Sequence, residues 1–190
     1  MNDLEDMMVI WKEMDGKLKS LVEENRRLAD EIKKNRLLSS HEKLIRKYRA
    51  FIIMEAICIP LIFLVLGANP LVVEKYRWAA LIYFECFFLM EIFIDGYLLY
   101  KLNSIDIYND SNVEISRRAR ANWKTHKIAI LIGIPIAIGA VALFCLALGT
   151  NTSMLWGVLV GGIIGLAIGL NEFFKFMKNY KVLSEKEPFD

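Results

Sequence analysis

The sequence predicts an all-α membrane protein, with an N-terminal amphipathic or coiled-coil helix followed by a four-helix transmembrane bundle. The chain of 190 residues is 55% hydrophobic, and its mean hydropathy of +0.35 is high for a soluble domain. Polar residues dominate before about residue 50, and four long apolar runs follow. These runs lack the period-two alternation of membrane strands, so they indicate helices.

The first segment, residues 1–38, carries apolar side chains at heptad spacing, which predicts a coiled coil or an amphipathic docking helix in the cytoplasm. With position a set at Leu4, Asn25 also falls on position a, where a polar residue favours one register of a parallel pair. The e and g positions offer few complementary charges, which weakens the homodimer and favours a different partner helix. The expected contact stripe is Leu4, Met7, Trp11, Met14, Leu18, Leu21, Asn25, Leu28 and Ile32.

Three roles for this segment remain open from the sequence. It dimerises the protein, it docks onto another cytoplasmic protein, or it lies on the membrane surface. The third role is disfavoured by an acidic start and by Glu23, Glu24, Asp30 and Glu31, because anionic headgroups repel carboxylates.

The second segment, residues 39–50, is expected to begin a new, basic helix that runs into the membrane. Ser39 and Glu42 have the spacing of a capping box, which predicts a break in the preceding helix at Ser39. His41 is expected to be an exposed polar residue.

The third segment, residues 51–177, is expected to be the transmembrane domain, since a spanning helix needs about 20 mostly apolar residues. The expected spans are 51–68, 78–100, 128–149 and 154–174. The connection 101–127 and the tail 178–190 are then cytoplasmic.

Lysine and arginine residues orient these spans. Seven lie in residues 30–49, six in 101–127 and four in 175–190, whereas the connection 150–153 has none. Cytoplasmic loops carry the excess of basic residues. We therefore expect a multi-pass protein of the inner (cytoplasmic) membrane, in contact with membrane lipids and with both termini in the cytoplasm.

The connection 101–127 is expected to contain a helix. Ser111 and Glu114 form a second capping-box pattern, so the helix would begin at Asn112. Trp123 among lysines and arginines is typical of a residue that anchors a helix at the membrane interface. Retention of positive charge in the cytoplasm explains these basic residues without direct binding of nucleic acid.

Three carboxylates inside the expected spans suggest function, because charges in a bilayer are costly. Glu55 and Asp95 are expected to meet at one depth, with Glu91 one turn deeper, and the three form an acidic cluster that binds a cation or relays protons. The simpler interpretation is that Glu55 and Asp95 point toward the interface and pair with Arg49 or Lys101.

The last span carries four glycines at four-residue spacing, Gly157, Gly161, Gly165 and Gly169. Such a stripe is typical of close helix packing in membranes. We expect it to pack within the chain, against the face of Gly133, Ala137 and Ala140.

The sequence offers no catalytic constellation. It contains no candidate Ser-His-Asp set, no Cys-x-x-Cys and no HExxH motif, and only two histidines. We therefore expect neither an enzyme nor a bound metal or cofactor.

Five short stretches resemble a family of small four-span membrane proteins from Bacteroidota. They are Ile10–Met14, Glu23–Ala29, Glu42–Tyr48, Asn69–Arg77 and Ser104–Tyr108. The resemblance covers nearly the whole chain, and it implies an association with extracytoplasmic-function sigma factors, in which the membrane protein holds the sigma factor inactive.

The favoured function is therefore that of a membrane-anchored regulatory protein. Its N-terminal helix would bind and tether a cytoplasmic partner, a sigma factor on the resemblance, in an anti-sigma role in transcription regulation. The alternative is an oligomeric ion channel or transporter that uses the intramembrane carboxylates.

Overall fold

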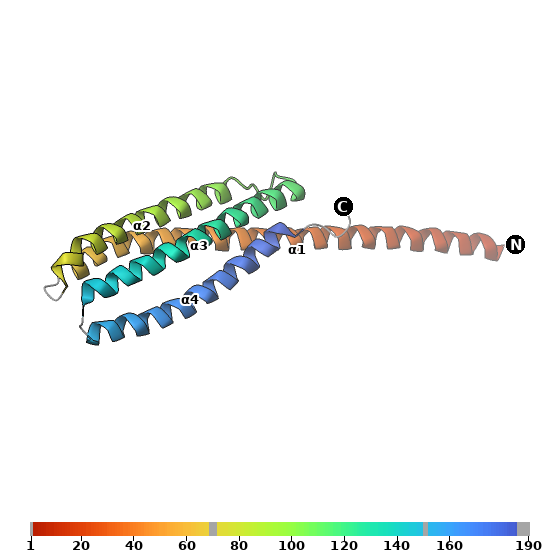
Figure 1. The fold of residues 1–190 in the computed structure, drawn as a ribbon. Helices are drawn as coiled ribbons and strands as arrows, with labels where there is room; N and C mark the ends of the chain where they lie inside the picture. Colours follow the sequence, from red (N-terminus) through yellow and green to blue (C-terminus); the bar gives the residue numbers. More distant parts are fainter. Residues whose placement is uncertain (1, 69–71, 150–151, 186–190) are drawn as a thin grey trace. The chain divides into compact units, whose positions relative to one another are not determined.

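The computed structural model describes residues 2–68, 72–149 and 152–185, and all regular structure in these ranges is helical (Figure 1). The side chains of residues 2–6 and 154 are not described. The elements are α1 (Asn2–Ile62), a π-helix η1 (Phe63–Gly67), α2 (Glu74–Asn103), α3 (Asn112–Leu148) and α4 (Thr152–Ser184). The chain divides into two compact units, Met1–Ser39 and Ser40–Asp190. We call them the arm and the helical domain.

Three helical stretches are long and apolar enough to span a membrane: Met7–Gly67, Asn112–Leu148 and Leu155–Ser184. The protein is therefore consistent with a membrane protein, as the sequence predicts. Helix α2, the expected second span, is not among these three, and it carries Glu85, Glu91 and Asp95 within its apolar stretch.

The predicted helix break at Ser39 is wrong, because α1 is helical from Asn2 to Ile62. No proline or glycine lies between Gly16 and Pro60, so no residue in this stretch interrupts the backbone hydrogen bonds of the helix. Pro60 lacks the N–H that would bond the carbonyl four residues earlier. The chain leaves α-helical geometry shortly afterwards, at η1.

One hydrophobic core of the helical domain lies where η1 meets the start of α2 and the end of α3. Its buried members are Leu66, Val72, Ala80, Leu81 and Ala147. The Val73 N–H donates to the Ala147 carbonyl at 2.8 Å, which ties the connection before α2 to α3. Gly149 ends α3 with φ of 62°, and a Cβ there would lie 2.9 Å from Val73 Cγ2. This position therefore requires glycine.

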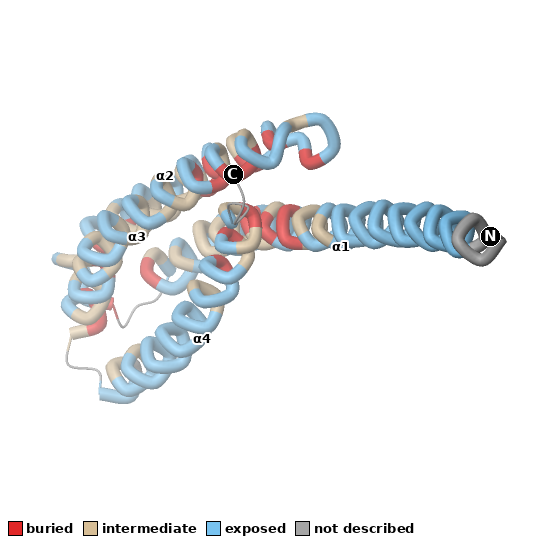
Figure 2. Tube along the Cα trace, turned by 90° about the vertical axis from the view of Figure 1, so that its right-hand side faces the viewer, coloured by how far each residue is buried: buried red, intermediate tan, exposed pale blue. Residues whose placement is uncertain are grey.

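A second core lies where the helices approach the connection 104–111. Its side chains are fully or nearly fully buried, and they come from all four α-helices (Figure 2). Its members are Leu44, Tyr48, Leu98, Leu102, Ile115, Ala119, Phe176, Tyr180 and Leu183. We call this the polar end of the helical domain, because the buried hydrogen bonds described below gather there.

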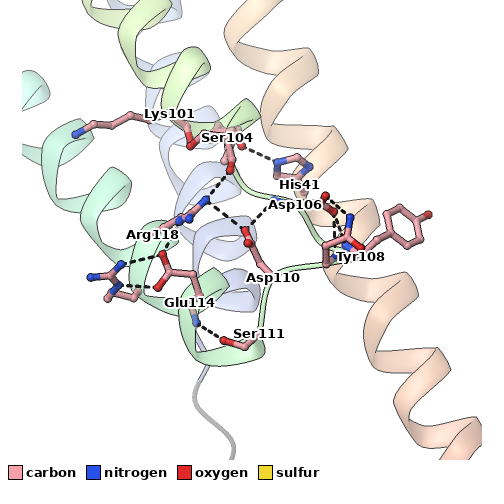
Figure 3. Close-up of polar contacts among 12 residues, drawn as sticks. His41, Lys101, Ser104, Asp106, Tyr108, Asp110, Ser111, Glu114 and Arg118 are labelled. Carbon is pink, nitrogen blue, oxygen red and sulfur yellow. Dashed lines mark hydrogen bonds and ion pairs between the residues drawn. The ribbon is translucent and has the colours of Figure 1, made fainter.

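The connection 104–111 is organised by side-chain hydrogen bonds (Figure 3). Asp106 Oδ1 accepts from the backbone N–H groups of Tyr108 and Asn109 at 2.8 and 3.1 Å. Ser111 caps α3, and its Oγ accepts from the Glu114 N–H at 3.3 Å. The predicted helix start at Asn112 is confirmed.

The expected exposure of His41 is wrong. The ring is 8% exposed, and its Nε2 lies 2.9 Å from the Leu102 carbonyl at the end of α2 (Figure 3). This carbonyl also accepts from the Ile105 N–H at 3.1 Å, so the histidine adds a second contact at the end of α2. The sequence pattern does not associate His41 with this helix end.

Candidate functional site

The predicted contact stripe of the arm is solvent-exposed. All residues from 7 to 32 are exposed (Figure 2), including Asn25. The apolar members whose side chains are described are between 49% and 71% exposed: Met7, Trp11, Met14, Leu18, Leu21, Leu28 and Ile32. The side chain of Leu4 lies outside the described residues. The arm thus presents an apolar stripe with nothing packed on it in a single chain.

The charges of the arm pair along the helix itself. Lys17 Nζ lies 2.7 Å from Glu13 Oε1, and Lys19 Nζ lies 2.7 Å from Asp15 Oδ2, both at four-residue spacing. Such pairs stabilise a helix by about 0.2–0.5 kcal/mol each. They help to keep the arm helical around Gly16, where helix propensity is poorest.

The helical domain contains a cavity of about 230 Å³ between α2 and α3. Glu91 and Asp95, one turn apart on α2, both line it. The α3 wall includes His126 and Gly133, and Glu91 Oε1 lies 3.0 Å from where a Gly133 Cβ would be. The remaining lining is apolar and consists of Phe87, Ile94, Ala129, Ile130, Ile134 and Ala137. The missing side chain at Gly133 thus makes room for a carboxylate.

The third predicted carboxylate, Glu55 of α1, lies close enough to interact electrostatically with Asp95 and Glu91, but it is not among the residues that line the cavity. Its Oε2 atom is buried and has no hydrogen-bond partner. The structure therefore brings the predicted acidic cluster together, and two of its members line the cavity.

The expected ion pairs of these carboxylates with Arg49 or Lys101 are wrong. Within the described residues, neither Glu55 nor Asp95 forms a salt bridge. The Lys101 ammonium instead lies 4.6 Å from the centroid of the Tyr97 ring. Asp95 is only 8% exposed, so it does not reach toward solvent.

An aromatic cluster joins three helices beside the cavity. The Trp123 ring stacks on His126 and Tyr180, at centroid distances of 5.5 and 5.1 Å, and His126 stacks on Phe176 at 5.1 Å. Tyr48 meets Phe176 edge-on at 5.1 Å. Trp123 is half-buried and packs against side chains of α3 and α4. Its expected role as an anchor at the membrane interface stays a prediction.

Hydrogen bonds link this cluster to the helix backbones. The Tyr48 hydroxyl lies 3.0 Å from His126 Nδ1 and 2.9 Å from the Tyr180 hydroxyl. Asn122 Nδ2 donates to the Tyr180 hydroxyl and to the Leu98 carbonyl, at 3.1 and 3.2 Å. The Asn122 Oδ1 atom is buried without a partner. Buried polar contacts of this kind fix how α1, α3 and α4 pack at the polar end.

Salt bridges link α1 to α4 and others lie at the start of α3. Lys47 pairs with Glu172 across α1 and α4, and Lys175 Nζ lies 2.6 Å from the same carboxylate. On α3, Glu114 accepts from Arg117 and Arg118 at 2.6–2.9 Å. These hydrogen bonds lower the pKa of Glu114 to about 2. Glu114 lies in the connection 101–127, outside the apolar run of α3.

The glycine stripe of α4 is not packed within the chain. A Cβ atom built at Gly157, Gly161, Gly165 or Gly169 would meet nothing within 4 Å. The expected contact with Gly133, Ala137 and Ala140 is therefore wrong. Gly133 faces Glu91 of α2, and Gly139 faces Tyr83 of α2. These small residues of α3 therefore point toward α2 and not toward α4.

Three residues on α3 escaped the sequence analysis as functional candidates: Asn122, His126 and, in this role, Gly133. They are spaced by four and seven residues and so share one helix face. Two polar residues and a glycine on one face of an apolar helix could have indicated a polar site at this helix contact. Within the described residues, no group of three or more His, Cys, Asp or Glu side chains has the arrangement of a metal site.

Comparisons of the chain with protein families, with curated proteins and with solved structures find no significant match. The similarity to four-span proteins associated with sigma factors therefore stays a prediction. The two structural features that can indicate a function are the exposed stripe of the arm and the carboxylate-lined cavity.

Proposed function

We propose that this protein is a membrane-anchored regulator whose arm binds an amphipathic helix of a cytoplasmic protein and holds it at the membrane. The observation that carries the proposal is the exposed apolar stripe of the arm. A sigma factor is the partner that the family resemblance implies, and the role would then be that of an anti-sigma factor.

The stripe is large enough to support binding. Burying one large apolar side chain contributes about 1.5–3 kcal/mol, and seven such side chains with described placement lie on it. Association costs about 4–15 kcal/mol in lost freedom of motion. Burial of most of the stripe against one partner helix would therefore leave a favourable balance.

A partner helix of different sequence fits the arm better than a second copy. Asp15 and Lys17, which fall at positions e and g of the heptad, already pair along the helix with Lys19 and Glu13. They are thus less available for the interhelical pairs that specify a coiled-coil partner. A cytoplasmic protein that presents its own apolar helix face supplies the missing surface without requiring matched charges.

The tether also requires a membrane topology, which we propose as four spans with both termini in the cytoplasm. Helix α2 has 30 residues, which at 1.5 Å per residue is about 45 Å and long enough to cross a bilayer. Glu91 and Asp95 lower its hydropathy, but they line a cavity against α3. Intramembrane charges that face a protein interior are the tolerated kind.

The experiment is recovery of the intact protein from native membranes in a mild non-ionic detergent, compared with a Leu21→Asp variant. Leu21 is 55% exposed at the centre of the stripe, so a charge there should abolish partner binding without disturbing the fold. The readouts are the identity of the copurifying protein and the molar mass of the purified complex.

Lys12→Gln is the matched control, because it changes the charge by the same one unit beside the stripe and leaves the apolar side chains intact. A cytoplasmic protein lost with Leu21→Asp and retained with Lys12→Gln supports the tether. A change in self-association alone would identify the stripe as a homodimer interface. Equal recovery from all three chains would exclude the stripe as the binding surface.

A further inference from the structure

The cavity between α2 and α3 has an excess of hydrogen-bond acceptors over donors. Asp95, which lines it, is 92% buried because its exposed fraction is 8%, and no hydrogen bond or salt bridge to it is present within the described residues. Glu91 is the second carboxylate on the lining. A buried carboxylate without a partner is costly, by several kcal/mol.

Two further acceptors on the same helices as the lining or close to its carboxylates are also unpaired. Glu55 Oε2 and Asn122 Oδ1 are both buried acceptors with no partner. The amide donor of Asn122 is already engaged, since its Nδ2 donates to the Tyr180 hydroxyl and to the Leu98 carbonyl. Buried polar groups in native proteins are almost always paired, so several unpaired acceptors together indicate that a donor is missing.

Among the described residues, the one basic side chain on the lining is His126, whose Nδ1 faces the Tyr48 hydroxyl. The cavity lining contains neither lysine nor arginine. The nearby Lys47 pairs with Glu172, and Lys101 lies over the Tyr97 ring. A positively charged ligand would therefore find two carboxylates on this lining and no lysine or arginine to compete with it.

We propose that this cavity binds a small organic cation of the primary alkylammonium class. An ammonium group has three N–H donors and one positive charge, which match Asp95 and Glu91. The apolar wall formed by Phe87, Ile94 and Ile130 would contact a short alkyl chain.

The volume favours this class over a bare metal ion. A cavity of about 230 Å³ is several times the roughly 30 Å³ that one water occupies in the liquid. Within the described residues, no side chains are arranged as metal ligands. Binding here requires neither the arm nor transport across the membrane, so this inference stands apart from the proposed tether.

Trp123 provides a reporter for the experiment. Its ring stacks on His126 at 5.5 Å, and His126 lines the cavity. The other three tryptophans, Trp11, Trp78 and Trp156, are exposed, so their replacement by phenylalanine leaves Trp123 as the only indole. The full chain is then titrated with propylammonium chloride in non-ionic detergent and phosphate buffer, because Tris is itself a primary amine.

Saturable change of Trp123 fluorescence with propylammonium is the expected result, with no change for 1-propanol or for potassium chloride at equal ionic strength. We expect the apparent Kd to rise at least tenfold in Asp95→Asn and in Glu91→Gln. Glu85→Gln is the matched control, since Glu85 is a carboxylate of α2 that does not line the cavity.

Three results would overturn the assignment. They are no saturable response to propylammonium, an equal response to 1-propanol or potassium, or unchanged binding in both cavity variants. If Asp95→Asn does not fold, Glu91→Gln and the comparison of propylammonium with 1-propanol on the parent chain still decide the question.

Discussion

The Glu91 carboxylate occupies space that a side chain at Gly133 would need, because its Oε1 lies 3.0 Å from the Cβ position. The same relationship recurs two turns further along α3. There, a Cβ at Gly139 would lie 2.8 Å from the Tyr83 hydroxyl, which donates to the Ile136 carbonyl at 3.1 Å. Glycines on α3 thus accommodate polar side chains of α2, and this is how two apolar helices enclose polar groups between them.

The contact between Gly139 and Tyr83 predicts that Gly139→Ala destabilises the protein by about 1–2 kcal/mol. The new methyl group would displace the tyrosine hydroxyl and break its hydrogen bond to the Ile136 carbonyl. The measurement is the free energy of unfolding in mixed detergent micelles, titrated with a denaturing detergent.

A Tyr83→Phe background tests this cause. Tyr83 Cζ is 3.5 Å from the Cβ position, which is an ordinary contact, so alanine at position 139 should be tolerated once the hydroxyl is gone. The cost of Gly139→Ala should fall by at least half in that background. An unchanged cost would place the strain elsewhere in α3.

The glycines of α4 predict the opposite behaviour. Gly161→Ala should leave the stability of a single chain unchanged or raise it by up to about 1 kcal/mol, since alanine has the higher helix propensity and nothing lies within 4 Å of its Cβ position. The same unfolding titration measures this, with the molar mass of the protein–detergent complex alongside. A marked destabilisation, or a fall in molar mass, would mean that the stripe packs against another copy.

The two capping-box patterns show what the sequence can and cannot predict about this fold. Ser111 and Glu114 cap α3 as predicted, whereas Ser39 and Glu42 lie within the uninterrupted helix α1. Ser111 follows an irregular connection in which Asp106 holds the backbone in a turn. Ser39 lies in a long run without proline or glycine. The capping motif therefore marks a helix start at Ser111, where irregular chain precedes it, and not at Ser39, where the chain before it is already helical.

The positions of the long apolar helices follow from hydropathy, but their contacts do not. The heptad spacing of the arm identified the stripe that proves exposed, and the spacing of Glu91 and Asp95 placed both on one face of α2. His41 was misjudged because its partner, the Leu102 carbonyl, is far away in sequence. The same separation hid the contacts of Trp123 with Tyr180 and of His126 with Tyr48. Local patterns carry no information about which helix faces which.

The buried tyrosine pair predicts that Tyr48→Phe costs about 1–3 kcal/mol. Tyr48 is fully buried, and removal of its hydroxyl leaves His126 Nδ1 and the Tyr180 hydroxyl without their partner at 3.0 and 2.9 Å. Equilibrium unfolding measures the loss. Tyr100→Phe, at a ring that is 73% exposed, serves as the control and should change the free energy of unfolding by less than about 0.5 kcal/mol.

The ion pairs of Glu114 predict a pH-dependent contribution to stability. Because its pKa is lowered to about 2 from an ordinary 4.5, the stabilisation is fully present above pH 4.5. It is lost as the pH falls from 4.5 toward 2, where the folded protein must bind a proton. The difference in melting temperature between the parent and Glu114→Gln should therefore shrink as the pH falls within this window.

The exposed Glu42 supplies a control for this titration, because it makes no ion pair within the described residues. Glu42→Gln should track the parent chain between pH 6 and pH 3. A difference between parent and Glu114→Gln that stays constant across this range would show that Arg117 and Arg118 do not stabilise the charged form.

The proposed four-span topology predicts that the two ends of α2 lie on opposite sides of the membrane. Single cysteines replace the exposed residues Glu74 and Val113 in a chain whose native Cys58, Cys86 and Cys145 are changed to alanine. In intact spheroplasts, a membrane-impermeant maleimide should label position 74 and spare position 113 until the cells are lysed. Lys and Arg residues are more frequent around position 113, which is why that side is expected in the cytoplasm. Labelling of both positions, or of neither, before lysis would place both ends of α2 on one side and leave three spanning helices.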